Sequence, residues 1–282
     1  MKIRTHIVYK HEDGMRLSSF LKGKVSPQFS GKKVQEAIHN GMCRVNGKLE
    51  RFASYRICEG DRIQIDIDKL GEQIVEQGPL RFLYEDEFFS CINKPPKREC
   101  SERSFPGVHL AHRLDKDTSG CLLIAKSKPA QKMLEQLFSE RKIAKVYLAL
   151  VHGTVKNKSW DVENQLGPKK EFDGQTIYGS VKTGKRAKTS FQLVKQYTHF
   201  ALVKCVPVTG RTHQIRVHLK ESGHPIVGDL LYAKEEIIPK GVHRQLLHAY
   251  SLRFTHPVTK KELTLVAPLP SDYTIFLKNL EE

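Results

Sequence analysis

Residues 111–127 read AHRLDKDTSGCLLIAKS, and the interpretation of the whole chain starts from this segment. A charged loop, HRLDKD at residues 112–117, is followed by TSG at residues 118–120, whose residue types favour a turn, and then by an apolar strand. A charged loop that adjoins a rigid buried strand can hold reactive groups in place. The same pattern also fits an ordinary solvated turn, so these residues alone leave both interpretations open.

Further apolar segments surround this one from residue 80 to the end of the chain. They are short, rich in β-branched residues and often alternate with polar residues, which predicts strands. Apolar residues with helical spacing predict helices at residues 129–142, 212–222 and 271–280. Because strands outnumber helices and short turns join neighbouring strands, we expect an α+β domain with a mixed, mainly antiparallel sheet and flanking helices. The expected strands lie at residues 90–94, 121–126, 145–153, 189–197, 200–208, 248–254 and 262–268.

The N-terminal part of the chain predicts a small α/β module of its own. Two segments with helical apolar spacing are followed by strand-like alternation. Ser30 is suited to cap the second helix, and Asn40 and Gly41 are suited to end it. The predicted helices and strands lie at residues 15–25, 30–41, 43–50 and 61–67.

A polar segment separates this module from the main domain. Residues 69–79 read KLGEQIVEQGP, and their glycines, proline and charges are typical of a linker. The predicted organisation is therefore a small module with an N-terminal extension at residues 1–68, this linker, and a large domain at residues 80–282.

The charge of the chain points to a polyanionic partner. The net charge is +16 over 282 residues, and the basic residues are spread over the whole chain. Nucleic acid is the natural partner for such a chain. We expect no membrane span, because no stretch approaches about 18 consecutive apolar residues. The N-terminal segment lacks the pattern of a secretory signal, so a cytoplasmic location is expected, and the absence of a heptad pattern favours a monomer without an obligate protein partner.

Cysteines and histidines do not suggest a metal site. The six cysteines are scattered, form no C-x-x-C pair and mostly lie within apolar runs, so we expect reduced cysteines in the core. His109 and His112 have no clustered cysteine or carboxylate partners. We therefore expect neither a metal nor another cofactor.

The N-terminal module resembles the small RNA-binding module shared by a small-subunit ribosomal protein, bacterial tyrosyl-tRNA synthetases and many RNA-modifying enzymes. The matching residues are Arg16-Leu17 at the first helix, Asn40-Gly41 after the second, VNGK at residues 45–48 and GDRI at residues 60–63. Cations on the helices and on the turn would contact the phosphate backbone. The RNA-binding residues that this implies are Arg16, Lys32, Lys33 and Lys48.

The main domain resembles the RluA-type family of RNA pseudouridine synthases. The segment HRLDKDTSG at residues 112–120 matches the family signature, and KVYLALVHG at residues 145–153 and TGRTHQIRVHL at residues 209–219 match further family blocks in order and spacing. Smaller matches are NKP at residues 93–95, GHPIVGD at residues 223–229, LHA at residues 247–249 and HP at residues 256–257.

One segment departs from the family pattern. After NKP the family has a small, glycine-containing apolar run, whereas this chain has PKREC at residues 96–100 and a short path to His112. The departure bears on the nearby RNA-contacting loop and on the choice of target, not on the reaction.

The resemblance implies a role for each matching residue. Asp115 would be the catalytic carboxylate, as a nucleophile or as a base on the ribose, and Arg216 would pair with it and keep it ionised. Tyr147 would stack on the uracil, and Ile215 would also contact the substrate. Arg113 would fill the gap that the extruded uridine leaves in the RNA. We expect the target to be ribosomal or transfer RNA.

Three nearby polar residues are expected to have structural roles. Asp117 is interpreted as a turn residue whose side chain bonds the local backbone, although it could be a second acid. His112 and His213 are interpreted as hydrogen-bonded framework. Replacing Arg216 by methionine is expected to slow the reaction with little loss of fold, because the change removes a single charge on a helix.

Two other classes of function remain as alternatives. A non-catalytic RNA-binding or ribosome-assembly factor would use both basic domains, but phosphate binding gains nothing from the carboxylate of Asp115. A hydrolase of glycosidic or phosphodiester bonds is the second alternative. Asp115 and Asp117 are too close in sequence to straddle a sugar at the ~6.5–9.5 Å of an inverting glycosidase.

Overall fold

The computed structural model divides the chain into two compact units. Unit 1 is Met1–Gly78 together with Lys170–Ile177, and unit 2 is Pro79–Lys169 together with Tyr178–Glu282. The structure describes residues 3–25, 29–39, 41–66, 80–102, 104–172, 175–234, 237–239 and 241–281. The predicted linker at residues 69–79 lies outside these residues. Within them, no helix is long and apolar enough to span a membrane.

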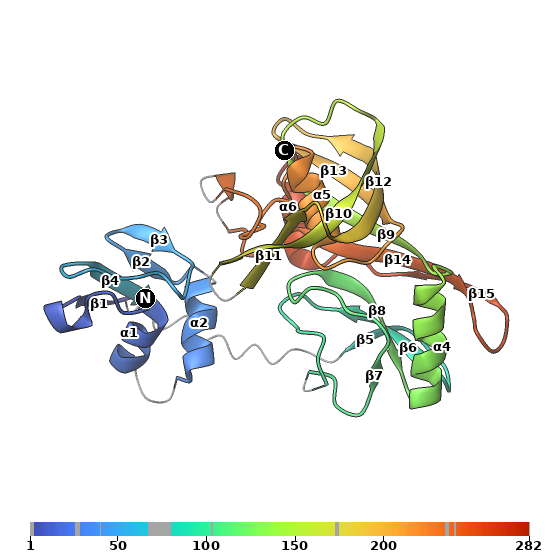
Figure 1. The fold of residues 1–282 in the computed structure, drawn as a ribbon, viewed down its shortest axis with the longest axis horizontal. Coiled ribbons are helices and arrows are strands. Elements are labelled where there is room, and N and C mark those ends of the chain that lie inside the picture. Colours follow the sequence, from blue (N-terminus) through green and yellow to red (C-terminus); the bar gives the residue numbers. More distant parts are fainter. Residues whose placement is uncertain are drawn as a thin grey trace. The chain divides into compact units, whose positions relative to one another are not determined.

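Unit 1 contains a four-stranded antiparallel sheet in the order β1-β4-β2-β3 together with helices α1 and α2 (Figure 1). The predicted N-terminal extension contributes β1, which pairs with β4 and so belongs to the sheet. The elements are β1 Ile3–Ile7, a 3-10 turn Lys10–Glu12, α1 Leu17–Lys24, α2 Gly31–His39, β2 Cys43–Val45, β3 Lys48–Glu50 and β4 Arg62–Asp66.

Both helices of unit 1 bury their apolar face in one core with the sheet. Fully buried residues of this core include Leu17 and Ile38 on the helices and Ile63 on β4. Ser30 caps α2, because its hydroxyl accepts a hydrogen bond from the backbone N–H of Lys33 at 3.3 Å. Gly41 follows the helix with φ +73°, a conformation that suits glycine. The predicted start and the glycine stop of this helix are confirmed, and Asn40 lies outside the described residues.

Two motif segments of unit 1 hold each other in place. Asn46 and Gly47 have φ of 52° and 81°, as a two-residue turn between antiparallel strands requires. The Asn46 amide donates to Asp61 Oδ1 at 2.8 Å, and its carbonyl oxygen accepts from the Arg62 backbone N–H at 2.8 Å. Hydrogen bonds therefore connect the turn at residues 45–48 to the segment at residues 60–63. In the sequence these two segments appear only as separate matches to the RNA-binding module.

Unit 2 contains most of an eleven-stranded sheet, which has the order β11-β10-β12-β13-β9-β14-β8-β6-β5, with β15 added at β14 and β7 at β8. Every pair with a described register is antiparallel except β8 with β14. The elements are β5 Arg81–Glu85, β6 Phe89–Lys94, β7 His109–Leu110, β8 Ser119–Ala125, α4 Lys128–Ser139, β9 Ala144–His152, β10 Ser159–Phe172, β11 Gln175–Ser180, β12 Lys185–Gln196, β13 Phe200–Pro207, α5 Gln214–Glu221, β14 Leu247–Thr255, β15 Glu262–Val266 and α6 Ser271–Lys278.

The α+β class with a mixed, mainly antiparallel sheet is confirmed. Each predicted strand and each of the three predicted helices of the main domain is present, with ends shifted by a few residues. The sequence did not predict the hairpin of β10 and β11. Its first strand reads SWDVENQLGPKKEF, and the polar residues and the Gly-Pro pair hide its strand character.

The predicted turn at residues 118–120 is wrong in its position. The turn is formed by Lys116 and Asp117, while Ser119 and Gly120 already belong to the buried strand β8. Gly120 lies opposite Ala249 of β14 and has φ +112°, and a Cβ at this position would lie 2.2 Å from the carbonyl oxygen of Ala249. Glycine is therefore required here by the close approach of two strands.

We expect Gly120→Ala to lower the free energy of unfolding by about 3 kcal/mol or more, because the added methyl group clashes with rigid backbone. Gly223→Ala is a matched control: Gly223 also has positive φ, at +84°, but a Cβ there meets no atom within 4 Å. Its strain alone should lower the free energy of unfolding by only about 1–2 kcal/mol. Urea denaturation of both variants tests this order, and equal losses would contradict the proposed clash.

Candidate active site

Unit 2 contains a cleft of about 1110 Å³ whose lining includes all five residues that the sequence predicts for chemistry and substrate contact. They come from the loop before β8, from β9 and from the first turn of α5. The cleft-lining members of the predicted set are Arg113, Asp115, Tyr147, Ile215 and Arg216. Segments about a hundred residues apart in sequence, such as those of Asp115 and Arg216, thus meet at one site.

The cleft carries an excess of positive charge. Its lining includes two acids, Glu99 and Asp115, and a larger number of cations. Such an excess suits a polyanionic substrate. The cations are Arg113, Lys116, Arg141, Lys145, Arg211 and Arg216.

A buried lysine holds the loop that carries Asp115. Lys94 is fully buried at the end of β6, and its ammonium donates to the carbonyl oxygens of Pro95 at 3.0 Å, Arg98 at 2.8 Å and Lys116 at 2.9 Å. Burial lowers the pKa of Lys94 to about 8. These three bonds tie the loop at residues 112–117 to the segment after β6, which explains why a cation is buried here.

The segment that departs from the family pattern forms the support of this loop. Leu114 is buried with Cys100 and Phe105, and its backbone N–H donates to Cys100 Sγ at 3.4 Å. The Arg98 guanidinium lies over the Phe105 ring at 4.5 Å and donates to the carbonyl oxygen of Ser104. The described residues of the short path to His112 thus pack against Leu114, next to Asp115.

Arg216 is held between two carboxylates. Its Nη1 lies 3.0 Å from Asp115 Oδ2, while its Nε and Nη2 donate to the two oxygens of Asp229 at 2.7 and 2.8 Å. Asp229 is fully buried and also accepts from the backbone N–H groups of Leu231 and Tyr232. The bidentate pair with Asp229 fixes the guanidinium plane, so Nη1 is directed at Asp115.

The electrostatics keep Arg216 charged although it is buried. Burial works to lower its pKa, but Asp229 and Asp115 outweigh this effect and raise the pKa above its ordinary value. The Tyr232 ring packs against the guanidinium, with 5.0 Å between the guanidinium carbon and the ring centroid. Asp115 is the open end of this cluster, since its side chain is 28% exposed and Arg216 is only 6% exposed.

No role for Asp229 is predicted from the sequence. The only signal was its place at the end of the GHPIVGD match at residues 223–229. A buried partner is needed to balance the charge of Arg216, but the sequence does not show which carboxylate of the chain supplies it.

Tyr147 and Ile215 form an apolar part of the cleft. Tyr147 lies on β9 and packs between two core clusters, and burial raises the pKa of its phenol so that it stays neutral. Ile215 is buried at the start of α5. Arg113, in contrast, is exposed at the rim of the cleft.

Asp117 is placed differently from Asp115. It is not among the described residues that line the cleft. Its backbone carbonyl oxygen accepts a hydrogen bond from Arg244 Nη1 at 3.0 Å. Asp117 thus contributes to this turn a contact of its main chain, whereas a bond from its side chain was expected.

His112 and His213 each make a hydrogen bond to another part of the protein. His112 Nε2 accepts from the backbone N–H of Leu123 at 2.9 Å, and burial lowers its pKa to about 3. His213 Nδ1 lies 2.9 Å from Tyr232 Oη, and burial and the charge of Arg216 lower its pKa. In the described ranges, no group of three or more His, Cys, Asp or Glu side chains could hold a metal ion.

The residues predicted to bind RNA in unit 1 lie on its surface or close to it. Arg16 is exposed just before α1, and Lys32 and Lys48 are exposed on α2 and β3. Lys33 is half-buried, with its ammonium 5.3 Å from the centroid of the Phe29 ring. All four are part of unit 1, and none lines the cleft of unit 2.

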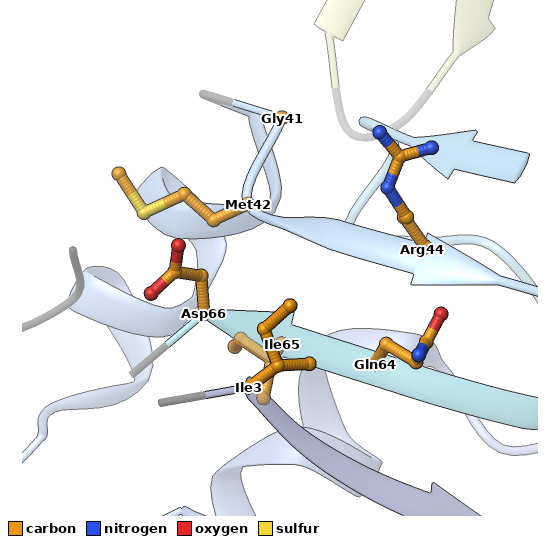
Figure 2. Close-up of a pocket in the computed structure, with 7 residues that line it drawn as sticks. All are labelled: Ile3, Gly41, Met42, Arg44, Gln64, Ile65 and Asp66. Carbon is orange, nitrogen blue, oxygen red and sulfur yellow. The ribbon is translucent and has the colours of Figure 1, made fainter. Parts of the chain in front are cut away.

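Unit 1 also has a small hollow on its sheet. Its volume is about 130 Å³, below the ~300 Å³ at which ligand pockets begin. Figure 2 shows its lining, in which Arg44 and Gln64 stand on β2 and β4, where they are paired across the sheet. The hollow is too small for a nucleotide. Its lining residues are Ile3, Gly41, Met42, Arg44, Gln64, Ile65 and Asp66.

Comparison with known proteins gives consistent matches. A family model described as RNA pseudouridylate synthase matches residues 91–221, which include Asp115, Tyr147 and Arg216. The uncharacterized RNA pseudouridine synthase YlyB of Bacillus subtilis (strain 168) is 31% identical, with 95% of this chain and 94% of that protein covered. The ribosomal large subunit pseudouridine synthase C of Vibrio vulnificus (strain CMCP6) is 32% identical, with 95% and 94% covered.

Solved structures agree with these matches. The structure of human RNA pseudouridylate synthase domain containing 1 is similar with a TM-score of 0.59 and 26% identity, and the match covers 72% of this chain and 95% of that chain. A second human protein, RNA pseudouridylate synthase domain containing 4, gives a TM-score of 0.58 at 25% identity, with 71% and 93% covered.

The burial of Arg216 corrects the expectation that its replacement leaves the fold intact. Arg216→Met would leave the fully buried Asp229 without its charge partner, so we expect the free energy of unfolding to fall by about 3–5 kcal/mol. Lys220→Met, at an exposed position of the same helix, should change it by no more than about 0.5 kcal/mol. Thermal and urea denaturation of the two variants measure this, and an unchanged stability of Arg216→Met would show that the pair with Asp229 does not support the fold.

The buried His248 should make the fold less stable in acid. His248 is fully buried; its Nε2 lies 3.0 Å from the Ala267 carbonyl oxygen and its Nδ1 lies 2.9 Å from Ser119 Oγ. Burial lowers its pKa from 6.5 to about 4. The unfolded chain therefore binds a proton that the folded chain excludes, and this residue makes stability fall as pH drops from about 6.5 to about 4, by about 1.4 kcal/mol per pH unit.

Urea denaturation between pH 7 and pH 4.5 tests this linkage. The free energy of unfolding should depend more steeply on pH in the wild type than in His248→Gln. The expected difference is about 1.4 kcal/mol per pH unit, which corresponds to about one proton. Identical slopes would mean that His248 takes up its proton in the folded state.

Proposed function

The chain belongs to the RNA pseudouridine synthase family and isomerises uridine to pseudouridine in RNA, and from this premise we propose that Asp115 is the reactive carboxylate of the cleft in unit 2. The observation that carries the proposal is the contact of 3.0 Å between Asp115 Oδ2 and the buried Arg216, at the one end of the Asp229–Arg216–Asp115 cluster that is open to the cleft. A carboxylate that is hydrogen-bonded to a fixed guanidinium is held in one orientation.

The reaction sets the demands on this site. The bond between ribose C1′ and uracil N1 breaks, the base turns, and a bond forms between C1′ and uracil C5; the proton on C5 leaves and N1 gains a proton. Asp115 can act by attacking C1′ or by removing a proton from the ribose. Either route needs an ionised carboxylate oxygen that faces the sugar, and the open side of Asp115 meets this need.

The base must be held while it is detached. We assign this role to Tyr147, which presents a neutral aromatic ring to the cleft, and to Ile215 beside it. Stacking on an aromatic ring contributes about 1–3 kcal/mol per base. Arg113, exposed at the rim, would take the place of the extruded uridine in the RNA stack, because its planar cation can stack between bases.

The target that we propose is ribosomal RNA of the large subunit. The relative from Vibrio vulnificus is named for this RNA and matches nearly the whole chain. Arg16, Lys32, Lys33 and Lys48 of unit 1 would bind the RNA backbone, and the enzyme would act as a monomer without a protein partner. Transfer RNA, which the sequence also led us to expect, is the alternative target. A map of the pseudouridines that are lost when the gene is deleted distinguishes the two.

The other classes of function are not favoured. A non-catalytic RNA-binding factor does not need a buried guanidinium that is aimed at an exposed carboxylate, and the family is one of enzymes. A hydrolase with paired acids is not favoured either, because Asp117 does not line the cleft beside Asp115.

We expect Asp115→Asn to reduce pseudouridine formation by at least about 10²–10⁴-fold, because the amide keeps the shape but loses nucleophilicity and basicity. RNA affinity should stay within a few fold. Asp117→Asn is the matched control, two residues further along the same loop and outside the cleft, and it should keep most of the activity. The measurement is chemical detection of pseudouridine in ribosomal RNA with each variant. Near-normal turnover by Asp115→Asn would refute the assignment.

A further inference from the structure

His213 breaks two local preferences at the edge of the cleft. Its backbone has φ 55° and ψ 16°, the left-handed conformation that is uncommon outside glycine. It also occupies the N-cap of α5 without a side-chain hydrogen bond to the helix, at a position where Ser, Thr, Asp or Asn is preferred. His213 is therefore an unfavourable residue for the start of this helix. Because it also lines the cleft, we expect it to have a role in the site.

The hydrogen bonds around His213 favour one tautomer of its ring. Tyr232 Oη accepts from the backbone N–H of Tyr178 at 3.0 Å, so its own proton is available for His213 Nδ1, 2.9 Å away. Nδ1 then accepts, and the proton of the neutral ring lies on Nε2. Burial and the nearby Arg216 lower the pKa of His213, which keeps the ring neutral.

The remaining N–H faces the catalytic carboxylate at a distance that leaves room for one atom. His213 Nε2 lies 3.9 Å from Asp115 Oδ2, too far for a direct hydrogen bond. A single oxygen about 2.8 Å from each of them can bridge the two. This oxygen must accept a hydrogen bond from His213 and donate one to Asp115, so a substrate group in this position must be a hydroxyl group.

Uridine offers one such group inside an RNA chain. The uracil carbonyl oxygens only accept, and N3–H only donates. The 3′ and 5′ oxygens of an internal nucleotide are esterified to phosphate. The ribose 2′-hydroxyl is the single group that can do both, and it is attached to the carbon next to C1′, where the bond to the base breaks.

We propose that His213 and Asp115 together bind the ribose 2′-hydroxyl of the extruded uridine, with Nε2–H donating to the hydroxyl and the hydroxyl donating to Asp115 Oδ2. The inference rests on the proposed role of this cleft and names the substrate group that it recognises. His213 is thereby a recognition residue that distinguishes RNA from DNA at the target nucleotide, and Tyr232 is a positioning residue that acts through it.

The test uses one RNA hairpin around a uridine that the full-length enzyme converts. It is synthesised with ribose, 2′-deoxyribose or 2′-fluororibose at that single nucleotide. Single-turnover rates give the penalty of each replacement, defined as the rate with ribose divided by the rate with the altered sugar. We expect a 2′-deoxy penalty of about tenfold or more for the wild type, in line with an unpaired donor and acceptor. Fluorine cannot donate to Asp115, so its penalty should be similar.

Two amide variants provide the comparison. His213→Asn tolerates the left-handed backbone but is too short to reach the hydroxyl, whereas His213→Gln can place an N–H near the position of Nε2. We expect His213→Asn to convert the ribose substrate more slowly and to show a 2′-deoxy penalty several-fold smaller than the wild type. His213→Gln should restore part of both the rate and the penalty.

Tyr232→Phe is a second way to disturb the same contact. It removes the hydroxyl that holds the proton on Nε2 and leaves residue 213 unchanged, so its 2′-deoxy penalty should also be smaller. Thermal denaturation of each variant identifies those that are folded, and Tyr232→Phe decides the matter if His213→Asn is not folded.

The outcomes separate this inference from the proposed function. Equal 2′-deoxy penalties in the wild type and in the folded variants would overturn the role of His213, as would a wild type that converts the ribose and 2′-deoxy hairpins at one rate. In both cases the proposed function would still be supported if the wild type converts the ribose hairpin and Asp115→Asn does not. Full conversion by Asp115→Asn would remove the premise itself.

Discussion

The Asp229–Arg216–Asp115 cluster is the interaction on which the site depends. A buried guanidinium needs compensating charge, and Asp229 supplies it through two short hydrogen bonds with no exposure to solvent. Two of the three guanidinium nitrogens, Nε and Nη2, thereby bond to Asp229 in the interior. The third is left to contact Asp115 at the cleft, so the position of the Asp115 carboxylate follows from a charge balance in the core.

The loop that carries Asp115 is fixed by the same kind of compensation. Lys94 is buried because three carbonyl oxygens surround its ammonium, and one of them belongs to Lys116 in this loop. On the other side, Gly120 lets β8 and β14 approach so closely that no side chain fits between them. The short segment with Cys100 and Phe105 fills the space beneath Leu114. A loop held at both ends and from below moves little, which favours a preorganised site.

The surroundings of the carboxylate combine attraction for RNA with control of protonation. Cations outnumber acids around the cleft, so the site attracts a polyanion, while burial keeps Tyr147 and His213 neutral. Neutral groups can offer a ring face or a single N–H to a nucleotide without competing for its phosphates. The charged and neutral parts of the cleft therefore suit different parts of one substrate.

The sequence by itself determined the features that local periodicity and motif spacing encode. These are the strands and helices of the main domain, the cap of α2, and the set of Asp115, Tyr147 and Arg216, which the family resemblance named and the structure brings to one cleft. The polar strand β10 was not predicted, because its polar and apolar residues do not alternate clearly.

Only the tertiary structure decided how these residues are balanced. Residues 214–219 of helix α5 include three polar side chains, yet all six residues are buried. Gln214 and His218 bond to Thr189 of β12, and Arg216 bonds to Asp229. The sequence therefore showed neither Asp229 behind Arg216 nor Tyr232 behind His213, and it predicted a mild effect for the loss of Arg216. The physical reason is that burial and charge pairing are properties of residues that fold together, while periodicity and motifs are properties of residues that follow one another.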